Sequence, residues 1–184
     1  MRNRYLDEAI AALRHTGSQA RSAFGALRPE QLNWKPGPGT WSIGQCLDHL
    51  ITTHERYYPQ FDAVACGQKR RSFWERIPLL PGLWGRMLLR SMRSPAKHKT
   101  VPAFTPADGT VRADIVEAFA ANLEELIRRI EDTDCVDHAR TMITSPAAAF
   151  VTYSLYDGIG ILTAHAERHL GQAQRVQQMP EFPA

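Results

Sequence analysis

The chain has 184 residues, of which 43% are hydrophobic and 22% are charged. This length suits one domain over residues 1–184, and the composition excludes collagen-like, coiled-coil and disordered chains. No apolar run approaches the roughly 18 residues of a membrane span, so no transmembrane segment is expected. The first residues lack the apolar core of a signal peptide, which predicts a cytoplasmic location. Three widely spaced cysteines exclude a disulfide framework and a cysteine-rich zinc site.

The net charge of +3 is unevenly distributed. Residues 67–100 contain nine lysines and arginines against Glu75 alone, a local charge of +8, so the rest of the chain carries −5. No recognised nucleic-acid-binding motif accompanies this basic segment, and we therefore expect no nucleic-acid partner.

Apolar residues recur at helical spacing in four long stretches, at about residues 3–27, 42–67, 110–132 and 154–178. Two of these helices open on capping-box patterns, Ser42 with Gln45 and Ser154 with Asp157. The Trp41 side chain, just before the first box, could pack against Cys46 as a hydrophobic staple. Four amphipathic helices in one domain predict an all-α fold, a four-helix bundle.

The connection between the second and third long helices, residues 67–109, is long and proline-rich. One short helix at about residues 83–94 fits between Pro81 and Pro95. A connection of this length predicts a bundle that is not simply up-down-up-down. The only strand signal is a weak one at Ala149–Tyr153.

Two histidines on the last helix, His165 and His169, are the first candidates for chemistry. Residues four apart on a helix are neighbours, about 5–6 Å apart at Cβ, so both imidazoles can reach one cation. A zinc protease would need Glu directly after the first histidine, but Ala166 stands there and Glu167 is turned toward solvent. Two core histidines without a metal would explain the pair as well.

The second helix offers His49 and His54. A third imidazole from this helix would complete a three-histidine site with a position left for water or substrate. His54 lies nearer the centre of the apolar face, where a core histidine with a hydrogen-bond partner is the simpler interpretation. Periodicity alone does not choose between the two residues.

Two longer motifs carry a family resemblance. They are Trp-Ser-Ile-Gly-Gln-Cys-Leu-Asp-His-Leu at residues 41–50 and Leu-Thr-Ala-His-Ala-Glu-Arg-His-Leu-Gly-Gln at residues 162–172. In their order and separation they resemble the DinB/YfiT-like family of metalloenzymes. The resemblance implies a four-helix bundle that holds a divalent metal ion through His49, His165 and His169, with His54 outside the ligand set. Three imidazoles suit zinc or nickel first, and iron, cobalt or copper as well.

The resemblance also implies a function. Several family members are similar to enzymes that use low-molecular-weight thiols such as bacillithiol or mycothiol, and homodimers are implied in the same way. The chain is therefore expected to act on a small substrate as a metal-dependent thiol S-transferase or hydrolase. The alternative is a metal- or ligand-binding module without turnover, because Asp48 and Glu55, which are near His49 in sequence, turn away from the presumed site.

The basic connection has three interpretations. The helix at about residues 83–94 could lie on a membrane surface, or it could form an anion-binding lid over the site. It could also pack on the bundle with a solvated rim of Arg86, Arg90 and Arg93. We expect residues 67–109 to flank the mouth of the site and to bind anions.

Overall fold

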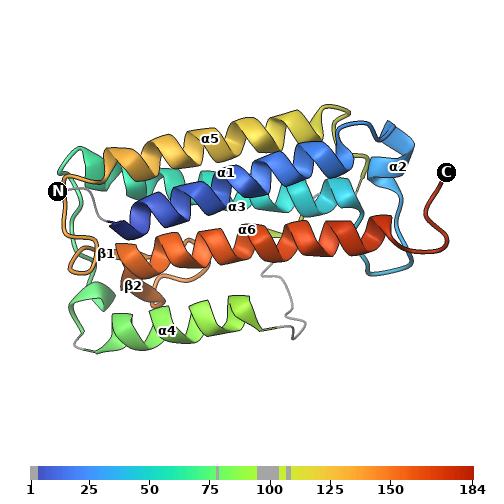
Figure 1. The fold of residues 1–184 in the computed structure, drawn as a ribbon. Coiled ribbons are helices and arrows are strands. Elements are labelled where there is room, and N and C mark those ends of the chain that lie inside the picture. The colour runs from blue at the N-terminus through green and yellow to red at the C-terminus, as the bar shows by residue number, and fades with distance from the viewer. Residues whose placement is uncertain (1–3, 78, 95–103, 107–108) are drawn as a thin grey trace.

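The computed structural model describes residues 4–77, 79–94, 104–106 and 109–184. Within these residues four long helices form a bundle: α1 (Arg4–Phe24), α3 (Ile43–Ala65), α5 (Ile115–Asp132) and α6 (Leu155–Gln177) (Figure 1). The predicted all-α four-helix bundle is confirmed. Lys97 and Lys99, counted above in the basic segment, lie outside the described residues.

The order of the helices is not a simple up-and-down one. Helix α1 packs against α5 and α6, and α3 packs against the same two helices, so α1 and α3 lie diagonally opposite. The colours in Figure 1 show that α1 and α6 run in one direction and that α3 and α5 run in the other. Helix α3 therefore ends at the opposite end of the bundle from the start of α5.

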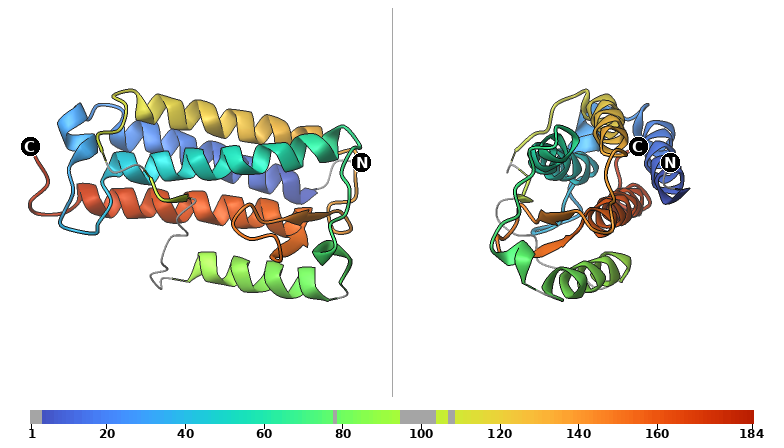
Figure 2. Two further views of the ribbon diagram at one scale, coloured as in Figure 1. Left: turned by 180° about the vertical axis from the view of Figure 1, so that it is seen from behind. Right: turned by 90° about the vertical axis from the view of Figure 1, so that its left-hand side faces the viewer.

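The chain covers this distance with a crossover that contains η1 (Trp74–Arg76) and α4 (Leu80–Arg93). At 1.5 Å per residue, the 14 residues of α4 span about 21 Å. Helix α4 lies outside the bundle, beside α6, as both views in Figure 2 show. It begins three residues before the predicted start, because Pro81 is accommodated in the first helical turn, where no backbone donor is needed.

Both predicted capping serines lie at the helix starts, and of the two helices α3 has the full reciprocal capping box. At the start of α3, Ser42 Oγ accepts from the backbone N–H of Gln45 at 3.1 Å, and Gln45 Oε1 accepts from the N–H of Ser42 at 3.3 Å. At the start of α6, Ser154 Oγ accepts from the N–H of Asp157 at 3.0 Å and donates to Asp157 Oδ2 at 2.7 Å. These bonds fix where the two helices begin and hence which of their residues face each other.

Helix α2 and strand β1 were not predicted from the sequence. Helix α2 (Pro29–Asn33) begins at a proline directly after the predicted end of α1. Strands β1 (Met142–Thr144) and β2 (Thr152–Ser154) form an antiparallel pair with Ile143 opposite Tyr153. The weak signal at residues 149–153 overlaps the first two residues of β2.

The core lies between the four long helices. Its fully buried side chains include Leu13 and Phe24 of α1, Leu47 and Leu50 of α3, Phe119 and Leu126 of α5, and Ile159 and Leu162 of α6. None of the helices in the described residues combines the length and the apolar content needed to cross a membrane.

Candidate metal centre

Three histidines meet where α3 packs against α6. His49 lies in the second turn of α3, and His165 and His169 lie one turn apart on α6. One nitrogen from each ring can be chosen so that all three lie within 4.8 Å of one another. The structure thus brings together the three residues that the family resemblance indicated.

The spacing of the rings suits a single cation. The Nε2 atoms of His49 and His165 are 3.1 Å apart. Two nitrogens bound to a tetrahedral zinc ion at 2.0–2.1 Å are separated by about 3.3 Å, so this pair is already close to the required geometry. The ring centroid of His169 lies 4.6 Å from each of the other two.

A hydrogen bond outside the cluster orients His49. Its Nδ1 lies 2.6 Å from the backbone oxygen of Phe104. A carbonyl oxygen only accepts, so Nδ1 carries the proton and Nε2 keeps its lone pair. Metal-binding histidines commonly have such a backbone partner on their second nitrogen. Phe104 belongs to the basic connection, which therefore reaches the cluster at this residue.

Trp41 forms one wall of the cluster. Its ring centroid lies 4.8 Å from that of His49, and its indole stacks on His169 at 5.6 Å and 28°. The sequence suggested a packing role for this residue, against Cys46. Trp41 lies before the N-cap of α3 and outside the helix, so helical periodicity does not place it at the site.

Burial keeps the three imidazoles neutral. It lowers the pKa of His49, lowers that of His165 well below the ordinary value, and lowers that of His169 to about 3. For His165 and His169 a neighbouring histidine lowers the pKa further, because a second positive charge nearby is unfavourable. The neutral form is the one that binds metal.

Some nitrogens in the cluster lack partners. The Nδ1 atoms of His165 and His169 are buried and without a hydrogen-bond partner among the described residues. A buried, unpaired nitrogen is costly, and an ion coordinated by that nitrogen would offset the cost. The three residues therefore fit a divalent metal ion.

His54 has a different environment. It is completely buried, and its Nδ1 lies 2.7 Å from Asn122 Oδ1 on α5. The amide nitrogen of Asn122 donates to the Tyr58 hydroxyl at 2.8 Å, so its oxygen accepts from His54. Burial lowers the pKa of His54 to about 4. Its Nε2 is also buried without a hydrogen-bond partner among the described residues, so His54 is a core histidine with one nitrogen bonded, set apart from the cluster by its bond to Asn122.

The nearby acidic and thiol groups do not enter the cluster. Glu55 and Glu167 are exposed and Asp48 is partly exposed. Cys46 is buried in the hydrophobic core, where desolvation raises the pKa of its thiol to about 12. It stays protonated, as a structural cysteine does.

The arginines of the crossover are placed away from the histidines. Arg86, Arg90 and Arg93 are exposed on the outer face of α4. Arg168, between the two histidines of α6, instead points to α4, where its Nη1 donates to the backbone oxygens of Ser91 at 3.3 Å and Ser94 at 2.5 Å. Helix α6 thus contacts the cluster with one side and caps the C-terminal end of α4 with another.

Comparison with known proteins gives a family and one related structure. The family model of the DinB superfamily matches residues 12–173. No curated protein matches the sequence. The structure is similar to that of YfiT from Bacillus subtilis, described as a probable metal-dependent hydrolase with an unusual four-helix bundle topology. The TM-score is 0.59 at 16% sequence identity, over 97% of this chain and 89% of YfiT, a likeness of fold.

Proposed function

Because the chain belongs to the DinB superfamily, we propose that it is a metal-dependent enzyme whose single divalent ion is held by His49, His165 and His169. The convergence of these three neutral imidazoles within 4.8 Å carries the proposal. Three protein ligands are typical of catalytic sites, which keep a coordination position open for water or substrate. Zinc or nickel is the first expectation for this donor set, followed by iron, cobalt or copper.

The chemistry available follows from the metal and from what surrounds it. A bound divalent ion lowers the pKa of a coordinated water to about 7 and deprotonates a coordinated thiol outright. The chain's own contribution is to orient His49 through Phe104, to exclude water with the Trp41 indole, and to keep the imidazoles unprotonated. Both hydrolysis and transfer of a low-molecular-weight thiol to a small substrate are compatible with this arrangement.

Two observations bear on the choice between these reactions. The description of YfiT as a probable metal-dependent hydrolase supports hydrolysis. The exposure of Glu55 and Glu167 supports thiol transfer, because a thiol that the metal deprotonates needs no carboxylate base. We propose hydrolysis first and thiol S-transfer second, with a binding module without turnover as the remaining alternative. A single domain, a homodimer and a cytoplasmic location stay predictions.

The test begins with metal content. We expect the purified protein to hold about one divalent ion per chain and each of His49→Ala, His165→Ala and His169→Ala to lose most of it. His54→Ala is the matched control on α3 and should retain the metal. A wild-type protein that takes up no divalent ion when supplied with zinc, nickel or cobalt would contradict the proposal.

The second step separates the reactions. Cobalt-substituted protein should show a visible spectrum that changes when a low-molecular-weight thiol is added if the thiol enters the open position. Ester and amide substrates are then assayed with and without that thiol. Turnover that does not need the thiol supports a hydrolase, turnover that requires it supports a transferase, and metal binding without either supports the binding module.

A further inference from the structure

An exposed apolar surface lies over the crossover, away from the histidines. Eight large hydrophobic side chains are exposed among the described residues. Six of them lie at the start of η1 or in it, at its junction with α4, in α4, and in the loop between β1 and β2. We call this set the crossover face: Phe73, Trp74, Leu79, Leu83, Met87 and Phe150. Figure 2 shows η1, α4 and the strand pair on the same side of the bundle.

The members of the crossover face are linked by contact and by helical spacing. Phe73 lies against Trp74 at 5.4 Å between ring centroids, and Trp74 lies 6.4 Å from Phe150. Leu79, Leu83 and Met87 follow one another at intervals of one helical turn. Leu79 is 88% exposed and has a positive φ of 65°, a left-handed conformation that is strained for a leucine.

The same surface is strongly basic. Residues 69–94 contain seven lysines and arginines and a single acidic residue, Glu75. On a helical wheel Leu83 and Met87 lie within an arc of about 120° together with Arg86, Arg90 and Arg93, and all five are exposed. The opposite face of α4, with Leu88, Leu89 and Met92, packs against the core.

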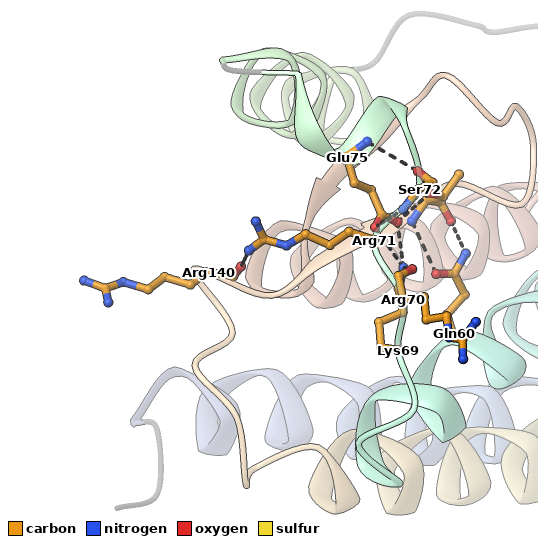
Figure 3. Close-up of polar contacts among 8 residues, drawn as sticks. Gln60, Lys69, Arg70, Arg71, Ser72, Glu75 and Arg140 are labelled. Atoms are coloured by element: carbon orange, nitrogen blue, oxygen red, sulfur yellow. Dashed lines mark hydrogen bonds and ion pairs between the residues drawn. The ribbon is translucent and has the colours of Figure 1, made fainter.

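The one carboxylate of this stretch does not neutralise the surface. The Glu75 side chain is fully buried, and its Oε1 accepts from Lys69 at 2.7 Å and from the Thr144 hydroxyl at 2.6 Å (Figure 3). Its Oε2 accepts from the backbone N–H of Ser72 at 3.1 Å, and Gln60 of α3 donates to the Thr144 backbone oxygen. The network holds η1 against β1 and α3, so this part of the crossover face is fixed relative to the bundle.

We propose that the crossover face docks on an anionic membrane surface. Exposed aromatic and aliphatic side chains among arginines are the composition of segments that lie in the lipid interface, with the apolar residues among the acyl chains and the cations at the headgroups. A second copy of the chain fits less well, because a two-fold contact would oppose two faces that each carry +6 over residues 69–94. Nucleic acid also fits less well: Leu79, Leu83 and Met87 offer no π-face for base stacking, and no recognised nucleic-acid-binding motif accompanies the aromatic residues of the face.

The test is cosedimentation of the metal-loaded protein with vesicles. One set contains equal parts of phosphatidylcholine and phosphatidylglycerol, and the other contains phosphatidylcholine alone. We expect binding to the anionic vesicles that weakens as salt is raised, and at least tenfold weaker binding to the neutral ones. Equal binding to both sets, or binding to neither, would overturn the proposal.

Paired variants locate the surface. Leu83→Ser with Met87→Ser should lower the vesicle partition coefficient at least tenfold, and Arg86→Gln alone about fivefold. Met179→Ser, an exposed hydrophobic residue after α6, and Arg14→Gln on α1 are the matched controls and should bind as the wild type does. Controls that lose binding as strongly as the crossover variants would contradict the assignment.

Two further measurements keep the outcome clear. Sedimentation velocity tests whether the wild type self-associates and whether Leu83→Ser with Met87→Ser abolishes that association. Self-association through the crossover face without vesicle binding would overturn the membrane proposal. The His49→Ala protein should bind vesicles as the wild type does, so failure of the metal proposal and failure of the docking proposal are separate results. If the apolar double variant melts lower than the wild type, Arg86→Gln with Arg90→Gln gives the same answer through charged residues alone.

Discussion

The two sides of α6 differ in burial and in charge. Toward α3, the helix places His165 and His169 beside His49 in a buried, neutral cluster. Toward α4, it supports a crossover whose outer face is exposed, basic and rich in large hydrophobic residues. The first region depends on the packing of two long helices in the core, and the second depends on a few individual contacts.

Those contacts can be identified. Arg168 caps the end of α4, and the Glu75 network holds η1. Gly85 lets α4 approach α6, because a Cβ at that position would lie 2.4 Å from Asp157 Oδ2. Substitutions in the crossover should therefore loosen it while leaving the histidine cluster in place, and substitutions in the cluster should do the reverse.

The largest effect is expected from removing the metal. Binding to the native state alone stabilises a protein by about 3 kcal/mol when the free ion is at 100 times its Kd, so a chelator should lower the Tm of the wild type by several degrees. His165→Ala should show almost no chelator effect, because it has little metal to lose. Differential scanning calorimetry with and without chelator makes the measurement, and an equal shift in both proteins would mean that the ion binds elsewhere.

The next largest effect should come from Glu75→Ala. The substitution leaves the ammonium of Lys69 and the hydroxyl of Thr144 without their partner in a largely buried place, at a cost of about 2–3 kcal/mol. Hydrogen exchange should rise over residues 69–94, while metal content stays at the wild-type level. Glu75→Gln, which keeps an acceptor for Thr144, should be milder. Loss of metal in either variant would show that the two regions are coupled.

Much of this fold could be predicted from the sequence because its signals are local. Ser42 and Ser154 mark the starts of α3 and α6, and the predicted ends of the long helices fall within a few residues of those observed, except the start of α5. Prolines gave a weaker signal where they stand in a first helical turn, as Pro29 does in α2 and Pro81 in α4. Proline excludes helix interiors but suits the first turn, so it alone cannot distinguish an end from a beginning.

The site was only partly predictable. The spacing of His165 and His169 gives a pair on one face, but periodicity could not choose between His49 and His54. The choice came from the resemblance, and in the structure it depends on contacts between distant segments. Phe104, 55 residues after His49, supplies the backbone oxygen that orients it, and no periodic pattern encodes such a contact.

A smaller effect is expected from adding one methyl group to α4. Gly85→Ala would place a Cβ against the Asp157 carboxylate, and we expect a loss of about 1–3 kcal/mol from overpacking. Gly82→Ala is the control on the same helix, because a Cβ there would meet nothing within 4 Å. It should be neutral or stabilising by up to about 1 kcal/mol, since alanine favours helix. Chemical denaturation of both variants makes the comparison, and equal effects would show that α4 does not pack closely on α6.

The smallest effect concerns pH and tests whether His54 belongs to the core. Its pKa is lowered from 6.5 to about 4, so between these values the unfolded chain binds a proton that the folded chain does not. Stability should therefore fall as the pH drops below 6.5, with a contribution from His54 of about 1.4 kcal/mol per pH unit. In urea denaturation between pH 7.5 and 5.5, His54→Gln should lose this part of the slope and still hydrogen-bond Asn122. If His54→Gln instead loses the bound metal and leaves the pH dependence of stability unchanged, His54 is a metal ligand and not a core residue.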